Sequence, residues 1–593
     1  MRLATVDTSL CNSKVCGIPC VTFCPVNRIG RKTVWIGPDE KAKIEEKNCI
    51  GCGICVHKCP FDAINIVNLA DTLDKMLIHR YGQNAFALYG LPEIKLGYVT
   101  GIVGRNGAGK STSINILSGR LTPNFGGEKR DISSFFRGSE LKAYFEGLGS
   151  GSIRVSTKPQ LVEESTVSGT SLKSLLEEKE IDKEKAHGLI EKLGLGYLAD
   201  RSLEQLSGGE LQLVLLAYTL SKDADVYIID EPSSYLDVYQ RMQAAKAIRE
   251  TASTGKTVAV VEHDLIVLDY LSDYVSVVYG VPGAFGLASK AYGTRNGINN
   301  FLRGYLPEEN MKLREGSIDF FDVTLEKPET GPPSLSWGGM SKVLGSFRLE
   351  VEEGTARQSS VVALLGRNGT GKTTFVRILA GIVKPDVGET PIGMRVSYKP
   401  QMLHPIPGTV RDVMREVEQT KSSSEVYEED VYQALGIERL LNRELSSLSG
   451  GELQKVAVAL CLGRDAEVFL LDEPSAFLDV EERLRIGKAV RRLVAARKAT
   501  AFVVDHDLLL LTYISDSLIK FDGESGKWGR ARHPSKVLDG VNAFLKEVGI
   551  TMRRDPDTGR PRVNKDGSVL DRQQKSSGAY FMVSAERGDR VEG

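Results

Sequence analysis

The sequence predicts an α/β protein in which two similar P-loop domains follow a small, cysteine-rich α+β domain. Eight of the nine cysteines precede residue 60. Two P-loop motifs begin at Gly104 and Gly366, each after an apolar strand-like run and at the start of a helix. The motifs that follow the first P-loop recur in the same order after the second. With 593 residues, the chain is long enough for roughly three to five domains.

Composition narrows the class of protein before any motif is considered. The hydrophobic fraction of 41% is ordinary for a folded chain, and the net charge of −1 favours neither a nucleic acid nor a membrane as partner of the whole chain. No apolar run reaches about 18 residues, and the first residues lack the pattern of a signal peptide. We therefore expect a cytoplasmic protein with no membrane partner, whose clustered cysteines bind metal rather than form disulfides.

The N-terminal cysteines fall into two groups that each end in Cys-Pro. The second group has the C-x2-C-x2-C-x3-C-P spacing of bacterial-type ferredoxins, and the first departs from it in two gaps. Zinc is the alternative, but zinc sites usually separate two CxxC pairs by a longer loop. We predict two [4Fe–4S] clusters in a ferredoxin-like domain. By the two-cluster pattern, one cluster takes Cys11, Cys16, Cys20 and Cys59, and the other takes Cys24, Cys49, Cys52 and Cys55.

Each P-loop supplies the groups that bind the phosphates of a nucleotide. Backbone N–H groups and a helix N-terminus surround the phosphates, the lysine reaches the outer phosphates, and the Ser or Thr hydroxyl ligates Mg²⁺. The predicted ATP-binding residues are Gly104, Asn106, Gly107, Gly109, Lys110, Ser111 and Thr112 in the first motif, and Gly366, Asn368, Gly369, Gly371, Lys372, Thr373 and Thr374 in the second.

The motifs after each P-loop point to ATP hydrolysis. Apolar strands end in Asp230-Glu231 and in Asp472-Glu473, where the first acid helps to hold Mg²⁺ and the second polarises the attacking water. LSGGE motifs lie at Ser207, Gly208 and Gly209 and at Ser449, Gly450 and Gly451, KPQ motifs at Gln160 and Gln401, and histidines after apolar strands at His263 and His506. The spacing from Ser to Asp is 23 residues in both halves, and from Asp to His it is 33 and 34 residues. This set resembles the ATP-binding-cassette (ABC) superfamily.

The ABC resemblance implies two composite ATP sites. In that superfamily two cassettes meet head to tail, so that the P-loop of one cassette and the signature of the other enclose each ATP. Glu231, His263, Glu473 and His506 are then the catalytic residues, and Ser111, Gln160, Thr373 and Gln401 are the magnesium ligands. An aromatic residue before the P-loop often stacks on adenine. Tyr81 and Phe86 are the candidates in the first half, and Trp337 and Phe347 in the second, with a core role the equal alternative for each.

The first half carries an insertion that the second lacks. The spacing from Lys110 to Gln160 is 50 residues, whereas the spacing from Lys372 to Gln401 is 29. The extra residues include two short amphipathic patterns, 131–137 and 139–145, which predict a helix–loop–helix. An insertion must lie on the surface, where it often carries function, and its cations, Arg130, Arg137 and Lys142, interleave with aromatic residues. Those aromatic residues either share that function or pack the insertion onto its own cassette.

Domain limits follow from these motifs and from the linkers between them. We expect an iron–sulfur domain at 1–72, a first cassette at 73–290 with the insertion at about 127–155, a hinge at 291–318, a second cassette at 319–535, and a C-terminal hinge element and tail at 536–593. Seven cations lie between Arg553 and Lys575. Such a run is either a solvated tail or a contact for RNA phosphates.

A two-cluster head, two complete cassettes, an insertion in the first cassette alone and the linker GINNFLRGYLPEEN together resemble ABC subfamily E, the RNase L inhibitor family, with an archaeal character. The resemblance implies a monomeric, ATP-driven ribosome recycling factor. In such a factor, closure of the cassettes swings the iron–sulfur domain against the subunits and the bound release factor. The factor then stays on the small subunit through its rRNA and proteins. The second D-loop departs from the family pattern, reading SAFLD rather than SSYLD, and Glu262 stands where Asp is commoner. Both departures leave the relative rates of the two sites open.

Three other functions share some of these features. A transporter ATPase subunit has the same cassettes but docks on membrane proteins. A redox-coupled soluble ABC ATPase would use the clusters for electron transfer. DNA-repair and cohesin-type ATPases carry long coiled coils or zinc insertions, and the sequence shows neither.

Overall fold

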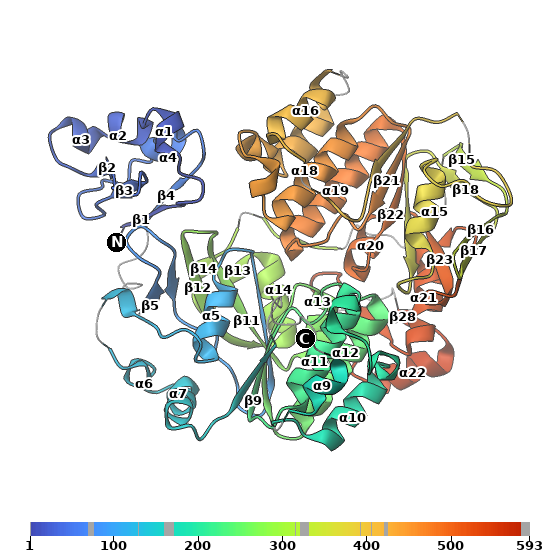
Figure 1. The fold of residues 1–593 in the computed structure, drawn as a ribbon, viewed down its shortest axis with the longest axis horizontal. Coiled ribbons are helices and arrows are strands. Elements are labelled where there is room, and N and C mark those ends of the chain that lie inside the picture. Colours follow the sequence, from blue (N-terminus) through green and yellow to red (C-terminus); the bar gives the residue numbers. More distant parts are fainter. Residues whose placement is uncertain are drawn as a thin grey trace, which may run out of the picture. The chain divides into compact units, whose positions relative to one another are not determined.

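The computed structural model describes residues 2–68, 76–127, 130–158, 171–178, 180–314, 316–320, 331–391, 393–404, 406–419 and 425–582 (Figure 1). The chain forms two compact units, and each is described by itself. The first comprises Met1–Ser234, Gln243–His263 and Leu271–Ser317, and the second comprises Tyr235–Met242, Asp264–Tyr270 and Ile318–Gly593. Predicted Gln160 lies outside the described residues, and the predicted domain limits stay a prediction.

The cysteine-rich head is an α+β domain, as predicted. Strand β1 (Arg2–Val6) pairs antiparallel with β4 (Ile64–Asn68), and β2 (Val34–Ile36) pairs antiparallel with β3 (Ala42–Ile44). Four short helices connect them: α1 (Ser13–Cys16), α2 (Pro19–Thr22), α3 (Pro25–Arg28) and α4 (Ile54–Lys58). Pro19 and Pro25 stand in the first turns of α2 and α3, where the missing N–H costs no helical hydrogen bond. The cysteines share the small core with residues such as Ala4, Ile44 and Ile64.

Asn84 fastens this head to the first cassette within the first unit. It lies in the loop between β5 (Leu77–Arg80) and β6 (Ala87–Tyr89) and is 2% exposed. Its Oδ1 accepts a hydrogen bond from the Ile44 N–H at 2.8 Å, and its Nδ2 donates to the carbonyls of Ala4 and Ile44 at 3.0 and 2.9 Å. The Val6 N–H donates to its backbone carbonyl at 2.7 Å. Arg80 adds an ion pair with Glu46 of the head.

The first cassette is built on an eight-stranded sheet with the order β5-β6-β12-β11-β7-β10-β9-β8. Its strands beyond β5 and β6 are β7 (Val99–Gly104), β8 (Val155–Lys158), β9 (Val226–Asp230), β10 (Thr257–Val261), β11 (Tyr274–Val281) and β12 (Phe285–Gly293). Strands β8, β9, β10, β7 and β11 run parallel. Every residue of β7, β9 and β10 is buried, as expected for parallel strands whose two faces are covered. The carboxyl ends of β7 and β9 carry the P-loop and Asp230 to the same edge.

Helices surround this sheet and place the motifs. The P-loop helix is α5 (Lys110–Leu117), and the signature helix is α11 (Gly208–Ser221). The others are α9 (Leu172–Leu176), α10 (Lys183–Lys192), α12 (Val238–Ser253), α13 (Leu265–Leu271) and α14 (Thr294–Arg303), which precedes the small hairpin of β13 (Tyr305–Leu306) and β14 (Met311–Lys312). None of the described helices combines the length and the apolar run that crossing a membrane requires.

The inserted segment forms two helices whose aromatic side chains pack onto the cassette. Helix α6 (Ile132–Phe135) begins at the N-cap Asp131, and α7 (Glu140–Ser150) follows it. Phe125, Tyr144 and Phe145 are buried in the core of the cassette, and Phe135 and Phe136 lie against it. The Tyr144 hydroxyl donates to the carbonyl of Leu117 at the end of α5. Of the two roles considered for the aromatic residues, packing within the cassette is the one observed.

The second cassette repeats this architecture. Its sheet has the order β16-β17-β24-β23-β19-β22-β21-β20, with β25 added beside β23. The strands are β16 (Met340–Leu344), β17 (Phe347–Val351), β19 (Ser360–Gly366), β20 (Val396–Lys399), β21 (Val468–Asp472), β22 (Thr500–Val504), β23 (Ser517–Glu524), β24 (Trp528–Ala531) and β25 (Ser535–Lys536), and β15 (Pro333–Trp337) pairs separately with β18 (Gly354–Arg357). The helices are α15 (Lys372–Leu379), α16 (Val410–Gln419), α17 (Glu425–Tyr427), α18 (Gly450–Gly463), α19 (Val480–Arg497), α20 (Leu508–Ile514) and α21 (Val537–Val548). The predicted pair of cassettes is therefore confirmed.

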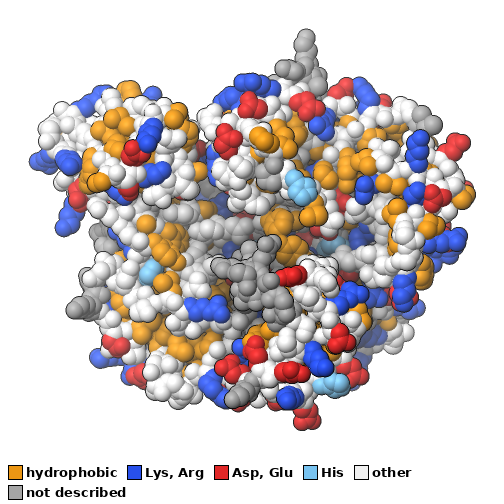
Figure 2. All heavy atoms as spheres, in the orientation of Figure 1, with side chains coloured by type: hydrophobic (Ala, Val, Ile, Leu, Met, Phe, Trp, Pro, Cys, Tyr) orange, Lys and Arg blue, Asp and Glu red, His pale blue; other side chains and the backbone are white. Residues whose placement is uncertain are grey.

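The C-terminal cationic run, 553–575, is folded. Strands β26 (Met552–Arg554), β27 (Pro561–Val563) and β28 (Phe581–Met582) form a small sheet beside α22 (Val569–Ser577). Arg560 is 0% exposed and lies 3.4 Å from Asp269, which also pairs with Arg562 at 3.0 Å. For Arg560 both predicted alternatives are wrong, because its side chain is buried and pairs with a carboxylate of the same unit. Arg562 is half-buried and pairs with the same carboxylate. On the face that Figure 2 shows, basic and acidic side chains are interspersed, in keeping with a net charge of −1.

Candidate functional site

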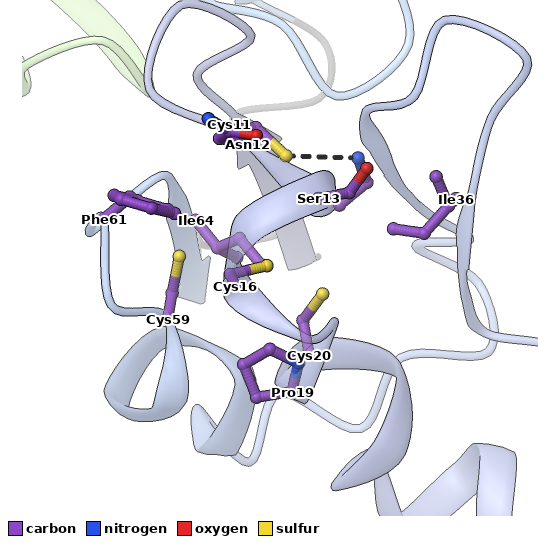
Figure 3. A pocket seen from close by; sticks show the side chains of 11 residues that line it. Cys11, Asn12, Ser13, Cys16, Pro19, Cys20, Ile36, Cys59, Phe61 and Ile64 are labelled. Atoms are coloured by element: carbon purple, nitrogen blue, oxygen red, sulfur yellow. Dashed lines mark hydrogen bonds between the residues drawn. The ribbon is translucent and has the colours of Figure 1, made fainter.

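Four of the predicted cluster ligands line one cavity in the head. Cys11, Cys16, Cys20 and Cys59 surround it together with apolar side chains such as Phe61 and Ile64 (Figure 3). Backbone N–H groups lie 3.4 Å from three of the sulfurs and donate to them: Ala42 to Cys11, Ile18 to Cys16 and Ala63 to Cys59. Such N–H···S bonds orient and stabilise the thiolates that hold an iron–sulfur cluster. The cavity fits the first predicted ligand set.

The second set of cysteines lies close to the first. The Gly51 N–H lies 3.4 Å from Cys49 Sγ and donates to it. Burial, together with the charges of the nearby Cys49 and Cys52, raises the pKa of Cys55 to about 12. Burial likewise raises the pKa of Cys20 to about 11. Thiols in this setting ionise when a cationic cluster stabilises the thiolate.

Zinc fits these cysteines less well. Among the described residues, no three His, Cys, Asp or Glu side chains converge closely enough to hold a single metal ion. A zinc ion would need its thiolates at about 2.3 Å from one point. Two [4Fe–4S] clusters therefore match the donor set, and the individual ligand assignments stay a prediction.

The two P-loops have the same geometry. Lys110 Nζ donates to the carbonyls of Gly104 and Arg105, both at 2.9 Å, and Lys372 Nζ donates to those of Gly366 and Arg367, both at 2.8 Å. Both helices begin at the lysine, after a glycine with φ of 99° or 96° that a side chain would strain. Each loop thus places its lysine at the N-terminus of a helix, an arrangement that fits the phosphates of ATP.

The acids at the ends of β9 and β21 are buried and lie beside the P-loops. Burial raises the pKa of Asp472 to about 6, and the Thr373 hydroxyl, which faces this carboxylate, lowers it in part. Within the part of the chain that the structure describes, neither carboxylate oxygen of Asp472 has a hydrogen-bond partner at ordinary distance and angle. Burial also raises the pKa of Asp230 to about 6, with a further contribution from the charge of Glu231. A buried carboxylate beside a P-loop hydroxyl is the donor set that Mg²⁺ takes in nucleotide sites.

The two predicted catalytic glutamates occupy matching positions. Glu231 and Glu473 have φ of 43° and 48°, a strained backbone region that is common at functional sites. Nε2 of His263 lies 3.4 Å from Glu231 Oε1, and Nε2 of His506 lies 3.4 Å from Glu473 Oε1.

Further contacts hold Glu473 in place. Gln401 Nε2 donates to Glu473 Oε1 at 2.8 Å. Burial raises the pKa of Glu473, but His506, Lys372 and Lys399 together outweigh burial and hold it at about 2. The structure thus brings Glu473, His506 and Gln401 together, as the motifs predict.

Two buried lysines belong to this site and were not predicted. Lys158 Nζ donates to the carbonyl of Asp230 at 3.2 Å, and Lys399 Nζ donates to those of Asp472 and Glu473 at 2.7 and 3.0 Å. Burial lowers the pKa of both lysines to about 8. The sequence contained a pattern that could have indicated these lysines, because both halves read Lys-Pro-Gln and a lysine thus recurs two residues before each glutamine.

The signature serines start their helices. Ser207 is the N-cap of α11, where its hydroxyl accepts from the Glu210 N–H and the Glu210 carboxylate accepts from the Ser207 N–H. Ser449 and Glu452 form the same capping box at α18. Gly208, Gly209, Gly450 and Gly451 follow in the first turns. Each signature therefore offers a helix N-terminus of the kind that binds phosphate. The pairing of each signature with the opposite P-loop stays a prediction.

Three of the four aromatic candidates lie at a P-loop. The Tyr81 ring is 56% exposed, and its hydroxyl lies 3.2 Å from Thr112 Oγ1. Phe86 and Phe347 pack so closely on Gly109 and Gly371 that a Cβ there would meet their rings at 2.7 and 3.1 Å. Trp337 is instead buried against Phe375 and Phe502, so its role is in the core.

Comparison with known proteins gives the same domains in the same order. The ABC transporter family matches residues 92–234 and 350–476, and the 4Fe-4S binding domain family matches residues 42–65. An uncharacterized ABC transporter ATP-binding protein of Methanocaldococcus jannaschii is 48% identical over 98% of both chains.

Two solved structures extend the comparison to named factors. The chain is similar to archaeal ABCE1 in a model of ribosome-bound Pelota and ABCE1, with 48% identity, a TM-score of 0.91, and coverage of 98% of this chain and 99% of that one. It is also similar to archaeal ribosome recycling factor aABCE1 in complex with the ribosomal stalk protein aP1. There the identity is 48% and the TM-score 0.82, over 86% of this chain and 99% of that one.

Proposed function

The chain belongs to ABC subfamily E, the RNase L inhibitor family, and from this membership we propose that it is an ATP-driven ribosome recycling factor of the cytoplasm. It splits post-termination ribosomes into subunits and stays on the small subunit. The observation that carries the proposal is the likeness to archaeal ABCE1 at 48% identity over 98% of the chain, in a ribosome-bound assembly with Pelota. Two cassettes with matching P-loops, acids and histidines support it, because a factor that closes on ATP needs both sites.

At each site the chain's own residues prepare water to attack ATP. The P-loop N–H groups and Lys110 or Lys372 bind the phosphates and hold the terminal phosphorus in line with the water. Glu231 or Glu473 accepts the proton of that water as its oxygen bonds to the γ-phosphorus and the bond to the β-phosphate breaks, releasing ADP. His263 and His506 lie beside the glutamates and hold the γ-phosphate end of the site. Ser111, Gln160, Thr373 and Gln401, together with Asp230 and Asp472, would hold the magnesium ion, which would supply neutralising positive charge.

The head transmits the cassette motion to the ribosome. Asn84 and the Arg80–Glu46 ion pair fasten it to the first cassette, so that it moves with that cassette when ATP closes the pair. The eight cysteines of the head would hold the iron–sulfur clusters, which would cross-link its small core and stiffen it. The moving head presses the subunits and the release factor apart, while the insertion and the hinge elements hold small-subunit rRNA and proteins.

Co-sedimentation with purified small ribosomal subunits tests the proposal. Intact protein, with its iron content verified, is incubated with a non-hydrolysable ATP analogue or without nucleotide. We expect stable binding with the analogue alone, and ATP-dependent splitting of 70S ribosomes when the release factor is added. The E231Q/E473Q variant should bind and yet fail to turn over. Absence of binding in both nucleotide states would overturn the proposal and favour a transporter or redox role.

The insertion offers a second test. Deletion of residues 131–145 should weaken binding to the small subunit and leave ATP hydrolysis by the free protein in place. Substitution of exposed Arg137 by Ala is the milder variant if the deletion unfolds the cassette. Unchanged binding in both variants would remove the insertion from the ribosome contact.

A further inference from the structure

The surroundings of the two catalytic glutamates match closely. The turn after each glutamate is the same, since the Ser234 N–H donates to the Glu231 carbonyl at 3.4 Å and the Ala476 N–H donates to the Glu473 carbonyl at 3.5 Å. The next residues, Tyr235 and Phe477, have φ of 64° and 63°. Each carboxylate also lies 3.4 Å from its histidine. A difference between the sites must therefore come from individual side chains.

The Glu262 departure does not create such a difference. The Ser233 hydroxyl donates to Glu262 at 2.8 Å, and in the second site the Ser475 hydroxyl donates to Asp505 at 2.9 Å. The N–H of the following histidine donates to the same carboxylate oxygen in both sites, at 2.7 and 2.8 Å. Glu262 therefore replaces Asp without changing the contacts of the histidine.

The departure in the second D-loop, SAFLD in place of SSYLD, does make the two sites different. The Ser234 hydroxyl donates to Glu231 Oε2 at 3.1 Å. Ala476 stands at the corresponding position of the second site and has no hydroxyl. There, Oε1 of Glu473 faces both His506 and Gln401, and no described residue donates a hydrogen bond to Oε2. The second glutamate thus keeps one oxygen open to water, whereas in the first site that oxygen already accepts a hydrogen bond.

We propose that Ser234 is a positioning residue that restrains Glu231 and makes ATP hydrolysis at the first site slower than at the second. To accept the proton of the attacking water through Oε2, Glu231 must weaken or give up the bond to the hydroxyl, and Glu473 has no such bond to lose. This inference rests on the proposed function, because it takes both glutamates as the bases of hydrolysis. A hydrogen bond of this kind changes a rate by about three- to tenfold.

Single-site enzymes separate the two rates. In the E473Q background, phosphate release reports the first site, and in the E231Q background it reports the second. We expect S234A to raise kcat of the first site by about three- to tenfold with KM for ATP unchanged, and A476S to lower kcat of the second site by a similar factor. S234T keeps the hydroxyl and should leave the first site as it was.

The proposal stands only if S234A accelerates the first site and S234T does not. An unchanged or lower rate in S234A overturns it, and so does an equal acceleration in S234T, which would indicate loosened packing. If S234A unfolds in thermal melts, A476S decides alone, and an unchanged second-site rate overturns the proposal. Failure of the proposed function looks different, because E231Q/E473Q would then hydrolyse ATP at the unsubstituted rate.

Discussion

Replacing Asn84 by Ala should loosen the iron–sulfur head from the first cassette without disturbing either part internally. The side chain makes three hydrogen bonds to the backbone of the head, to the Ile44 N–H, the Ile44 carbonyl and the Ala4 carbonyl. All three lie in a buried region, so the substitution leaves three backbone groups without their partner. The bond from the Val6 N–H to the Asn84 carbonyl uses the backbone and persists in every variant.

The expected cost follows from these contacts. At about 1 kcal/mol for each lost hydrogen bond, docking of the head weakens by about 3 kcal/mol, which is about 100-fold in the opening equilibrium. Asn84 has φ of 58°, a conformation that Asn tolerates and Ala adopts at a cost of about 1 kcal/mol more. N84G removes the side chain without that backbone strain, whereas N84D keeps the acceptor for the Ile44 N–H but sets a buried carboxylate oxygen against the carbonyls of Ala4 and Ile44, which is a repulsive contact. Both N84A and N84D should therefore open the head further than N84G, and N84G further than the unsubstituted protein.

Hydrogen exchange measured by mass spectrometry on peptides that contain Val6 and Ile44 detects this opening. Lost hydrogen bonds and backbone strain together cost about 4 kcal/mol in N84A, so exchange there should be about 1,000-fold faster and unchanged in the strands of the cassette sheets. In N84G, which lacks the strain, it should be about 100-fold faster. Asn48 is the matched control, because its side chain makes one exposed hydrogen bond within the head, to the Lys32 carbonyl at 3.3 Å. If N84A exchanged within threefold of N48A at these peptides, the inference that Asn84 fastens the head would be wrong.

Four further predictions follow from the sites. K399M removes the donor to the carbonyls of Asp472 and Glu473 and should lower phosphate release in the E231Q background by about tenfold or more, with N48A as the unaffected control. Arg241 Nη1 donates to Asp264 and to the carbonyl of His506 within the second unit, at 2.7 and 3.1 Å, so R241A should slow the second site more than R241K, which keeps the charge. Burial lowers the pKa of Lys372 to about 8, and the charged form of this lysine is the one that binds phosphate. ATP affinity in calorimetric titrations should therefore be steady below pH 8 and fall as the pH rises above it. Constant affinity up to about pH 9.5 would contradict this prediction. C24S should remove one cluster, about four irons per chain by elemental analysis, whereas C461S should remove none.

Local motifs explain why so much of the candidate site could be predicted. The P-loop lysines, the paired acids and the signature serines each act within a few residues of their own backbone. Ser207, for example, caps a helix through Glu210, three residues later. A short stretch of sequence is therefore enough to predict such local geometry. The helix–loop–helix was predicted for the same reason, although α7 continues to Ser150 because Leu148 packs on Gly119 of the cassette.

The residues whose roles could not be predicted from the sequence make contacts with distant parts of the chain. Arg560 looked like part of a solvated or RNA-binding run, but its partner Asp269 lies 291 residues earlier in the chain. Lys158 lies within a strand, where a lysine usually points to solvent, and only the fold shows that it meets the carbonyl of Asp230. Trp337 could not be assigned to adenine or to the core before the neighbouring Phe375 and Phe502 were located. In each case the deciding contact joins segments that no local pattern connects.

The fastening of the inserted helices has a mechanical consequence. Tyr144 hydrogen-bonds α7 to the last turn of α5, the helix whose first residue is the P-loop lysine, and Phe145 of α7 belongs to the same buried cluster as Leu117 of α5. A force applied to the outer face of the insertion therefore does not act through a flexible connection. It is transmitted to the phosphate-binding loop through α5, which is about two helical turns long. A force on the insertion and the binding of ATP at the first site therefore both act on α5.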